Sequence, residues 1–223
     1  MKKFFIVAHR GGKGPYEENT LNAMKNGLKS GAGAVEMDVR YDHFRNRFYL
    51  EHDFFHHPLQ RSNLIEKVIP FLPQKTTFFI ELKTLYWLRK GYALYFSKII
   101  KKYALSKKAV VMSFNPFVLM HLRKRAKYLQ IGMLLGNRFW SFLFRKFIYF
   151  FLEPQFIMLH KRFLRKKKLL KKMLKFAKRC RLKVLVFTVN KPYYWQQIRE
   201  LNLDGVITDY PQKAIAFYKS GDS

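Results

Sequence analysis

The stretch AVEMDV, residues 34–39, contains the alternation on which the expected fold depends. Side chains alternate between the two faces of a β-strand, so the valine and methionine side chains share one face while Glu36 and Asp38 share the other. The apolar face is suited to packing against helices. We therefore expect a strand that carries two neighbouring carboxylates on the face pointing into the fold.

Seven further short apolar runs are spread along the chain, and segments with helical spacing, such as residues 169–177, lie between most of them. The strands are expected at residues 4–8, 34–39, 77–82, 109–112, 130–135, 156–159, 184–189 and 205–207. A strand followed by a helix, repeated about eight times, predicts an α/β fold of the TIM-type (β/α)8 barrel class. The length suits a single domain over residues 1–223.

The alternation of strands and helices is interrupted between residues 42 and 75. Residues 47–51 are expected to form an extra strand there, and the rest is expected to be loop. We interpret this segment as a short insertion after the second barrel strand.

The strand expected at residues 77–82 repeats the arrangement of carboxylates. Glu81 and Lys83 would share its inward face, so that Glu81 adds a third carboxylate and Lys83 can hold a phosphate oxygen. Carboxylates in a confined space repel one another unless a proton or a cation offsets them, and oxygen ligands suit Mg²⁺ or Ca²⁺. We therefore expect one divalent cation at Glu36, Asp38 and Glu81.

Two histidines are expected near the same end of the barrel. His9 ends the first strand, and His52 follows the extra strand. Active sites of this fold class lie at the carboxyl ends of the strands. Because imidazole titrates near neutral pH, one histidine can act as a base and the other as an acid in phosphoester cleavage.

Eight short motifs occur in a fixed order along nearly the whole chain. They are His9-Arg10-Gly11, Glu18-Asn19-Thr20, Glu36-x-Asp38, His52-Asp53, Glu81-Leu82-Lys83, Ser113-Phe114, Thr188-Val189-Asn190 and the stretch at residues 204–211. In this order the chain resembles the glycerophosphodiester phosphodiesterase family. It departs from the family pattern at Glu17, where a proline is usual, and at Phe187, where a tryptophan is usual. We expect these departures to affect the choice of substrate.

The resemblance implies a TIM-type barrel that hydrolyses glycerophosphodiesters to an alcohol and glycerol 3-phosphate. It implies a metal site at Glu36, Asp38 and Glu81, an acid/base pair of His9 and His52, a phosphate site at Arg10 and Lys83, and a supporting or metal-binding role for Glu18. Either water attacks directly, or a glycerol hydroxyl attacks first to give a cyclic phosphate.

The charge is distributed unevenly. The chain has 44 Lys and Arg against 14 Asp and Glu, and its first 81 residues hold 12 basic and 9 acidic side chains. A field of this size attracts anionic lipid head groups, nucleic acid or phosphorylated substrates. Residues 161–183 carry 13 Lys or Arg and no acid, and residues 139–152 are rich in aromatic side chains. We expect region 139–183 to contact an anionic membrane; nucleic acid is less favoured, since no nucleic-acid-binding module accompanies the charge.

Two alternatives remain from the residues alone. One is a lysophospholipase D that acts on lysophospholipids at a membrane surface, and the other is a catalytically silent, basic barrel that binds membranes or nucleic acid. The lone Cys180 allows no intrachain disulfide, and the apolar run at residues 4–8 is too short for a signal peptide. We expect a cytoplasmic protein, attached peripherally at the inner face of a membrane.

Overall fold

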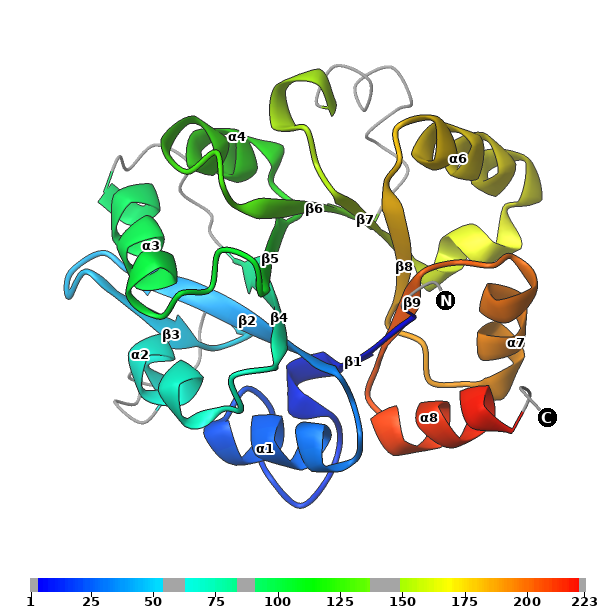
Figure 1. The fold of residues 1–223 in the computed structure, drawn as a ribbon, viewed down its shortest axis with the longest axis horizontal. Helices are drawn as coiled ribbons and strands as arrows, with labels where there is room; N and C mark the ends of the chain where they lie inside the picture. The colour runs from blue at the N-terminus through cyan, green and yellow to red at the C-terminus, as the bar shows by residue number, and fades with distance from the viewer. Residues whose placement is uncertain (1–3, 54–62, 84–90, 137–148, 221–223) are drawn as a thin grey trace.

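Eight parallel strands close into a barrel in the computed structural model, which describes residues 4–53, 63–83, 91–136 and 149–220 (Figure 1). The barrel strands are β1 (Phe5–Ala8), β2 (Ala34–Asp42), β4 (Thr77–Leu82), β5 (Ala109–Ser113), β6 (Gln130–Leu135), β7 (Phe156–His160), β8 (Lys183–Phe187) and β9 (Gly205–Thr208). They follow the order β1-β9-β8-β7-β6-β5-β4-β2, and pairing of β1 with β2 closes the ring. Each expected strand is present, so the predicted barrel is confirmed.

Helices surround the barrel on its outside (Figure 1). The α-helices are α1 (Leu21–Lys29), α2 (Ile65–Val68), α3 (Gly91–Lys102), α4 (Pro116–Arg125), α6 (Lys167–Arg179), α7 (Pro192–Glu200) and α8 (Pro211–Lys219). Short 3-10 helices follow β1, α2 and β7; they are η1 (His9–Gly11), η3 (Ile69–Phe71) and η4 (Lys161–Arg165). Thr20 caps α1 by accepting a hydrogen bond from the Ala23 backbone N–H. No helix in the four described ranges is long and apolar enough to cross a membrane.

The insertion after β2 contains more structure than expected. Its strand β3 (Arg47–Leu50) pairs antiparallel with β2, as predicted. The rest was expected to be loop, and this prediction is wrong, because α2 and η3 lie there with Ile65 and Val68 buried. A helix of four residues is shorter than the window in which helical spacing can be recognised.

The core has an inner and an outer layer. Inside the barrel, the rings of Phe5, Phe79 and Phe156 pack edge to face with centroids 5.7–5.9 Å apart. Outside it, the apolar face of β2 packs with the surrounding helices, as the alternation predicts. Residues 137–148, which include most of the predicted aromatic segment, lie outside the described residues. The apolar filling of the barrel leaves the polar side chains gathered at the carboxyl ends of β1, β2, β4 and β9.

Candidate active site at the carboxyl end of the barrel

Three carboxylates meet where β2 and β4 run side by side. Asp38 lies opposite Glu81 in the parallel register, and Glu36 precedes Asp38 on the same face of β2. Carboxylate oxygens of the three residues lie within 4.8 Å of one another. Glu36 and Asp38 are each only 1% exposed. The alternation of the two strands therefore places a dense, buried negative charge at this point.

Burial and mutual repulsion favour the protonated forms of Glu36 and Glu81 in this acidic group. Burial, followed by the charges of Asp38 and Glu81, raises the pKa of Glu36 well above its usual value. Burial and then Asp38 likewise raise the pKa of Glu81 to about 7. Protein carboxylates in this arrangement suit a hard divalent cation, which would replace those protons. The donor set thus fits the metal that the sequence predicts.

Two cationic side chains lie against the carboxylates. Arg10 Nε is 2.8 Å from Asp38 Oδ2, and Lys83 Nζ is 3.4 Å from Asp38 Oδ1 and 3.2 Å from Glu81 Oε1. Both cations are mostly buried, with side chains 20% and 14% exposed. They partly offset the negative charge and stand where an anionic substrate would approach the acidic group.

A strained turn at the end of β1 positions Arg10. Its φ of 51° is unusual for a residue with a side chain, and its backbone N–H donates to Glu36 Oε2 at 2.9 Å. The next residue, Gly11, has φ +89°, and a Cβ there would lie 2.4 Å from the Ala23 carbonyl carbon. Glycine is therefore required for this close approach between the turn and α1.

The Glu-Asn-Thr loop supports the site through two contacts. Glu18 Oε2 accepts a hydrogen bond from Arg10 Nη1 at 3.1 Å, and Arg10 in turn contacts Asp38, so Arg10 links Glu18 to the carboxylates. Asn19 is buried; its amide nitrogen donates to Asp38 Oδ2 at 3.2 Å, and its amide oxygen accepts from the Asp38 backbone N–H. The Glu-Asn-Thr motif alone gave no indication of this direct contact between Asn19 and Asp38.

His9 is oriented by a carboxylate 200 residues away along the chain. Its Nδ1 lies 2.6 Å from Asp209 Oδ1, and its Nε2 lies 4.0 Å from Glu36 Oε2. Burial alone would raise the pKa of Asp209, but hydrogen bonds to His9 and Asn190 lower it below the usual value. Because Asp209 is ionised, Nδ1 carries the proton and donates it, which leaves Nε2 able to accept a proton on the side of the acidic group.

Asp209 and Asn190 are the site residues that the sequence interpretation missed. Asn190 donates to Asp209 Oδ2, and its amide oxygen accepts from the Thr208 hydroxyl at 3.1 Å and the Asp209 N–H at 3.0 Å. Both residues belong to motifs that carried the family resemblance without an assigned role. Since β9 pairs with β1, a residue just after β9 had to lie close to His9, which directly follows β1.

His52 stands at the edge of this group. Its Nδ1 lies 2.6 Å from Asp53 Oδ1, and its side chain is 39% exposed. The preceding residue, Glu51, donates its backbone N–H to the Asp38 carbonyl at 3.0 Å, which fixes His52 near Asp38 in the middle of β2. Among the described residues, no contact joins His52 to His9 or to the three carboxylates. The structure thus brings seven of the eight predicted site residues into one network and places His52 next to it.

We expect Asp209→Asn to lower kcat by at least about tenfold with little change in KM, since an amide can donate to Nδ1 and stabilise the wrong tautomer of His9. The pH–rate profile should shift along with the rate, because the substitution removes a negative charge beside the imidazole. Steady-state kinetics across the pH range would measure both effects. An unchanged profile with unchanged kcat would contradict this role of Asp209.

The raised pKa of Glu81 predicts a pH-dependent stability of the metal-free protein. A carboxyl whose pKa rises on folding, here from 4.5 to about 7, stabilises the fold at low pH and loses that contribution as pH rises through 7. The loss should be on the order of 3 kcal/mol. In EDTA, the free energy of unfolding of Glu81→Gln should therefore increase relative to that of the wild type as the pH rises from about 5 to about 8, as measured by urea denaturation. If the free energies of unfolding of the two proteins changed in parallel with pH, this expectation would be contradicted.

Comparisons with known proteins agree on one family. The model of the family described as glycerophosphoryl diester phosphodiesterase matches residues 9–41 and 71–213. A glycerophosphodiester phosphodiesterase of Caldanaerobacter subterraneus is 23% identical over 98% of this chain and 99% of its own length. The barrel superposes with a TM-score of 0.81 on an Oleispira antarctica phosphodiesterase solved with its product sn-glycerol-3-phosphate, at 19% identity and 96% coverage of both chains. A glycerophosphodiester phosphodiesterase of Thermotoga maritima superposes with a TM-score of 0.77 at 22% identity, over 97% of this chain and 99% of that one.

Proposed function

The chain belongs to the glycerophosphoryl diester phosphodiesterase family, and from this premise we propose that it hydrolyses glycerophosphodiesters with a divalent cation bound to Glu36, Asp38 and Glu81. Family membership confirms the predicted phosphodiesterase and its glycerophosphodiester substrate class. The products we propose are an alcohol and glycerol 3-phosphate. The observation that supports the mechanism most strongly is the buried group of three carboxylates, within reach of two cations and an oriented imidazole.

We assign the anion-binding part of the reaction to Arg10 and Lys83. Both already contact the carboxylates, so a phosphodiester entering the site would find positive charge beside the metal ligands. The cation, Mg²⁺ or Ca²⁺, would polarise a phosphoryl oxygen and stabilise charge as it develops. Arg10 would add donors in a fixed geometry, since its backbone N–H and its guanidinium are both held by carboxylates. We propose that Glu18 supports Arg10 in this position.

We assign proton transfer to the two histidines. His9 Nε2 would take the proton from the attacking oxygen, which belongs either to water or to a glycerol hydroxyl. His52, held near Asp38 by the neighbouring Glu51, would give a proton to the oxygen of the departing alcohol. With water the balance is one phosphodiester and one water consumed, and one alcohol and one phosphomonoester formed. The cyclic route reaches the same products after water opens the cyclic phosphate.

A lysophospholipid is the second candidate substrate, and an aromatic wall favours it. The Phe187 ring lies 5.9 Å from the Phe114 ring and 5.5 Å from the His160 ring, at the carboxyl ends of β5, β7 and β8. In Figure 1, β7 and β8 lie across the barrel from β2 and β4. Phe114 is 45% exposed, so part of this wall remains open to a bound acyl chain.

We further propose that the chain acts as one domain in the cytoplasm.

Identifying the products tests the proposed function. Purified protein should convert glycerophosphocholine to glycerol 3-phosphate and choline with Mg²⁺ or Ca²⁺, and EDTA should stop the reaction, as followed by ³¹P NMR. A parallel assay with lysophosphatidylcholine would separate the two candidate substrates. Release of phosphocholine would refute the proposed bond cleavage. No turnover of either substrate with either metal would favour the catalytically silent barrel.

A further inference from the structure

The flank of the barrel formed by η4 and α6 carries a dense positive charge. Between Glu153 and Glu200 the chain has no acidic residue. Ten lysines and arginines within residues 162–179 are exposed, and none of their side chains forms an ion pair within the described parts of the chain. We call these ten cations, together with Phe150 and Phe151, the basic flank.

This charge opposes the stability of α6. Lys167, Lys171, Lys175 and Arg179 are spaced by four residues, which places like charges next to one another along the helix. Its first turn carries lysines and no acid, although the positive end of the helix dipole lies there. The helix is held to the barrel by its apolar side, through Leu170, Met173 and Ala177. The lysines are therefore not needed to fold α6, and an external negative surface would relieve their repulsion.

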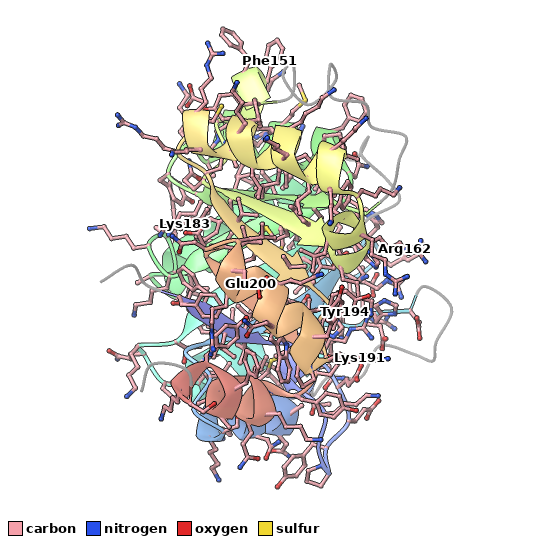
Figure 2. The ribbon with its side chains drawn as sticks, turned by 90° about the vertical axis from the view of Figure 1, so that its right-hand side faces the viewer. Phe151, Arg162, Lys183, Lys191, Tyr194 and Glu200 are labelled. Carbon is pink, nitrogen blue, oxygen red and sulfur yellow. The ribbon has the colours of Figure 1, made fainter. Side chains whose placement is uncertain are left out.

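An exposed aromatic pair lies beside this helix. Phe150 is 78% exposed and Phe151 is 47% exposed, with their rings edge to face at 5.9 Å. Tyr149, in the same helical turn, packs its ring against Phe176 of α6 at 5.5 Å, so the pair is fixed next to the charged helix. Figure 2 shows Phe151 at the edge of the molecule, beyond α6. Aromatic rings next to cations are the combination that binds the interface of an anionic bilayer.

We propose that the basic flank is the docking surface for an anionic phospholipid bilayer. The flank reaches the mouth of the barrel: in Figure 2 Arg162 lies on the side of Lys191 and Tyr194, which follow the carboxyl end of β8, while Lys183, at the amino end of β8, lies on the other side. A bilayer lying along α6 would therefore touch the rim of the mouth while the protein remains outside it. The flank is separate from the catalytic group, so the inference goes beyond the proposed hydrolysis and does not depend on it.

The observations favour a bilayer over nucleic acid. The ten cations lie on the convex outside of the barrel, where they face a flat anionic surface more easily than they could enclose a strand. The two exposed rings pack on each other as one apolar projection, whereas single-stranded nucleic acid is bound by rings that stack separately on successive bases.

Co-sedimentation with vesicles tests this surface. The wild type should bind vesicles of phosphatidylcholine mixed with phosphatidylglycerol, bind pure phosphatidylcholine weakly, and be released by high salt. Lys168→Glu/Lys172→Glu/Lys175→Glu should lower the partition coefficient by on the order of 100-fold or more. Phe150→Ser/Phe151→Ser, which keeps every charge, should lower it by about tenfold.

The matched control changes the same charge on the other side of the barrel. Lys98→Glu/Lys101→Glu/Lys102→Glu alters three exposed lysines of α3, across the ring from α6 (Figure 1), and should weaken binding by less than about fivefold. All three variants should keep wild-type turnover of soluble glycerophosphocholine, which shows that they fold. Vesicle binding without turnover in every protein would keep the docking surface and refute the proposed hydrolysis.

Three results would overturn the docking surface. The first is an equal loss of vesicle binding in the α3 and α6 variants, which would mean that binding depends on net charge alone. The second is no binding of the wild type to anionic vesicles. The third is binding to a short DNA duplex that is tighter than binding to vesicles and is lost in the α6 variant.

Discussion

Glu36→Ala should lower kcat/KM for glycerophosphocholine by at least about 1000-fold, because the substitution removes a proposed ligand of the cation that would stabilise phosphoryl charge. Binding of Mg²⁺ or Ca²⁺, measured by titration calorimetry, should weaken in parallel. The metal-free variant should unfold at the same temperature as the wild type or a higher one, since Glu36 is buried beside two other carboxylates. Loss of activity would then reflect chemistry and not misfolding.

The control for this substitution is Glu200→Ala, which removes an exposed carboxylate at the end of α7 that accepts a hydrogen bond from Gln196 Nε2. It should leave turnover and metal binding unchanged. Full activity in Glu36→Ala, or equal losses in both variants, would contradict the assignment of Glu36 as a metal ligand.

His9→Ala should lower kcat by about 10²- to 10⁴-fold, the range for a general acid or base, with a much smaller change in KM. Metal binding should persist, because His9 Nε2 is 4.0 Å from Glu36 Oε2 and His9 is not one of the three residues proposed to bind the metal. Pre-steady-state and steady-state kinetics at saturating metal would measure the effect. A loss of metal affinity as large as the loss of kcat would show instead that His9 organises the metal ligands.

His121→Ala is a suitable control for His9→Ala. His121 packs its ring on Tyr92 at 5.6 Å, on α4 outside the barrel. This substitution should alter stability and leave kcat unchanged. If both histidine variants lost the same fraction of activity, the effect of His9→Ala would be attributable to the fold.

The sequence predicts the barrel and the acidic group for one shared reason. Parallel strands buried on both faces read as apolar runs, so a carboxylate inside such a run is conspicuous. Glu36, Asp38 and Glu81 each interrupt an apolar strand, and the period of two places them on the inner face. The same rule predicted Lys83 on that face, where it lies 3.2 Å from Glu81.

The parts that the sequence could not predict depend on contacts between distant segments. Asp209 orients His9 across the pairing of β9 with β1, and nothing in the local sequence around His9 indicates such a partner. Asn19 adopts φ 60° and turns its amide onto Asp38, which depends on the loop conformation. The helical turn of α2 is too short to give a periodic pattern. In each case tertiary packing decides a position that local sequence leaves open.

The most direct test of the central claim is to measure bound metal and turnover in the same samples. Protein freed of metal with EDTA would be titrated with Mg²⁺ or Ca²⁺, with bound ion determined by equilibrium dialysis and glycerol 3-phosphate release assayed at each point. We expect the two quantities to rise together and to saturate at about one ion per chain in the wild type, and neither to rise in Glu36→Ala. Turnover that survives removal of the metal, or equal metal binding by both proteins, would contradict a catalytic cation at Glu36, Asp38 and Glu81.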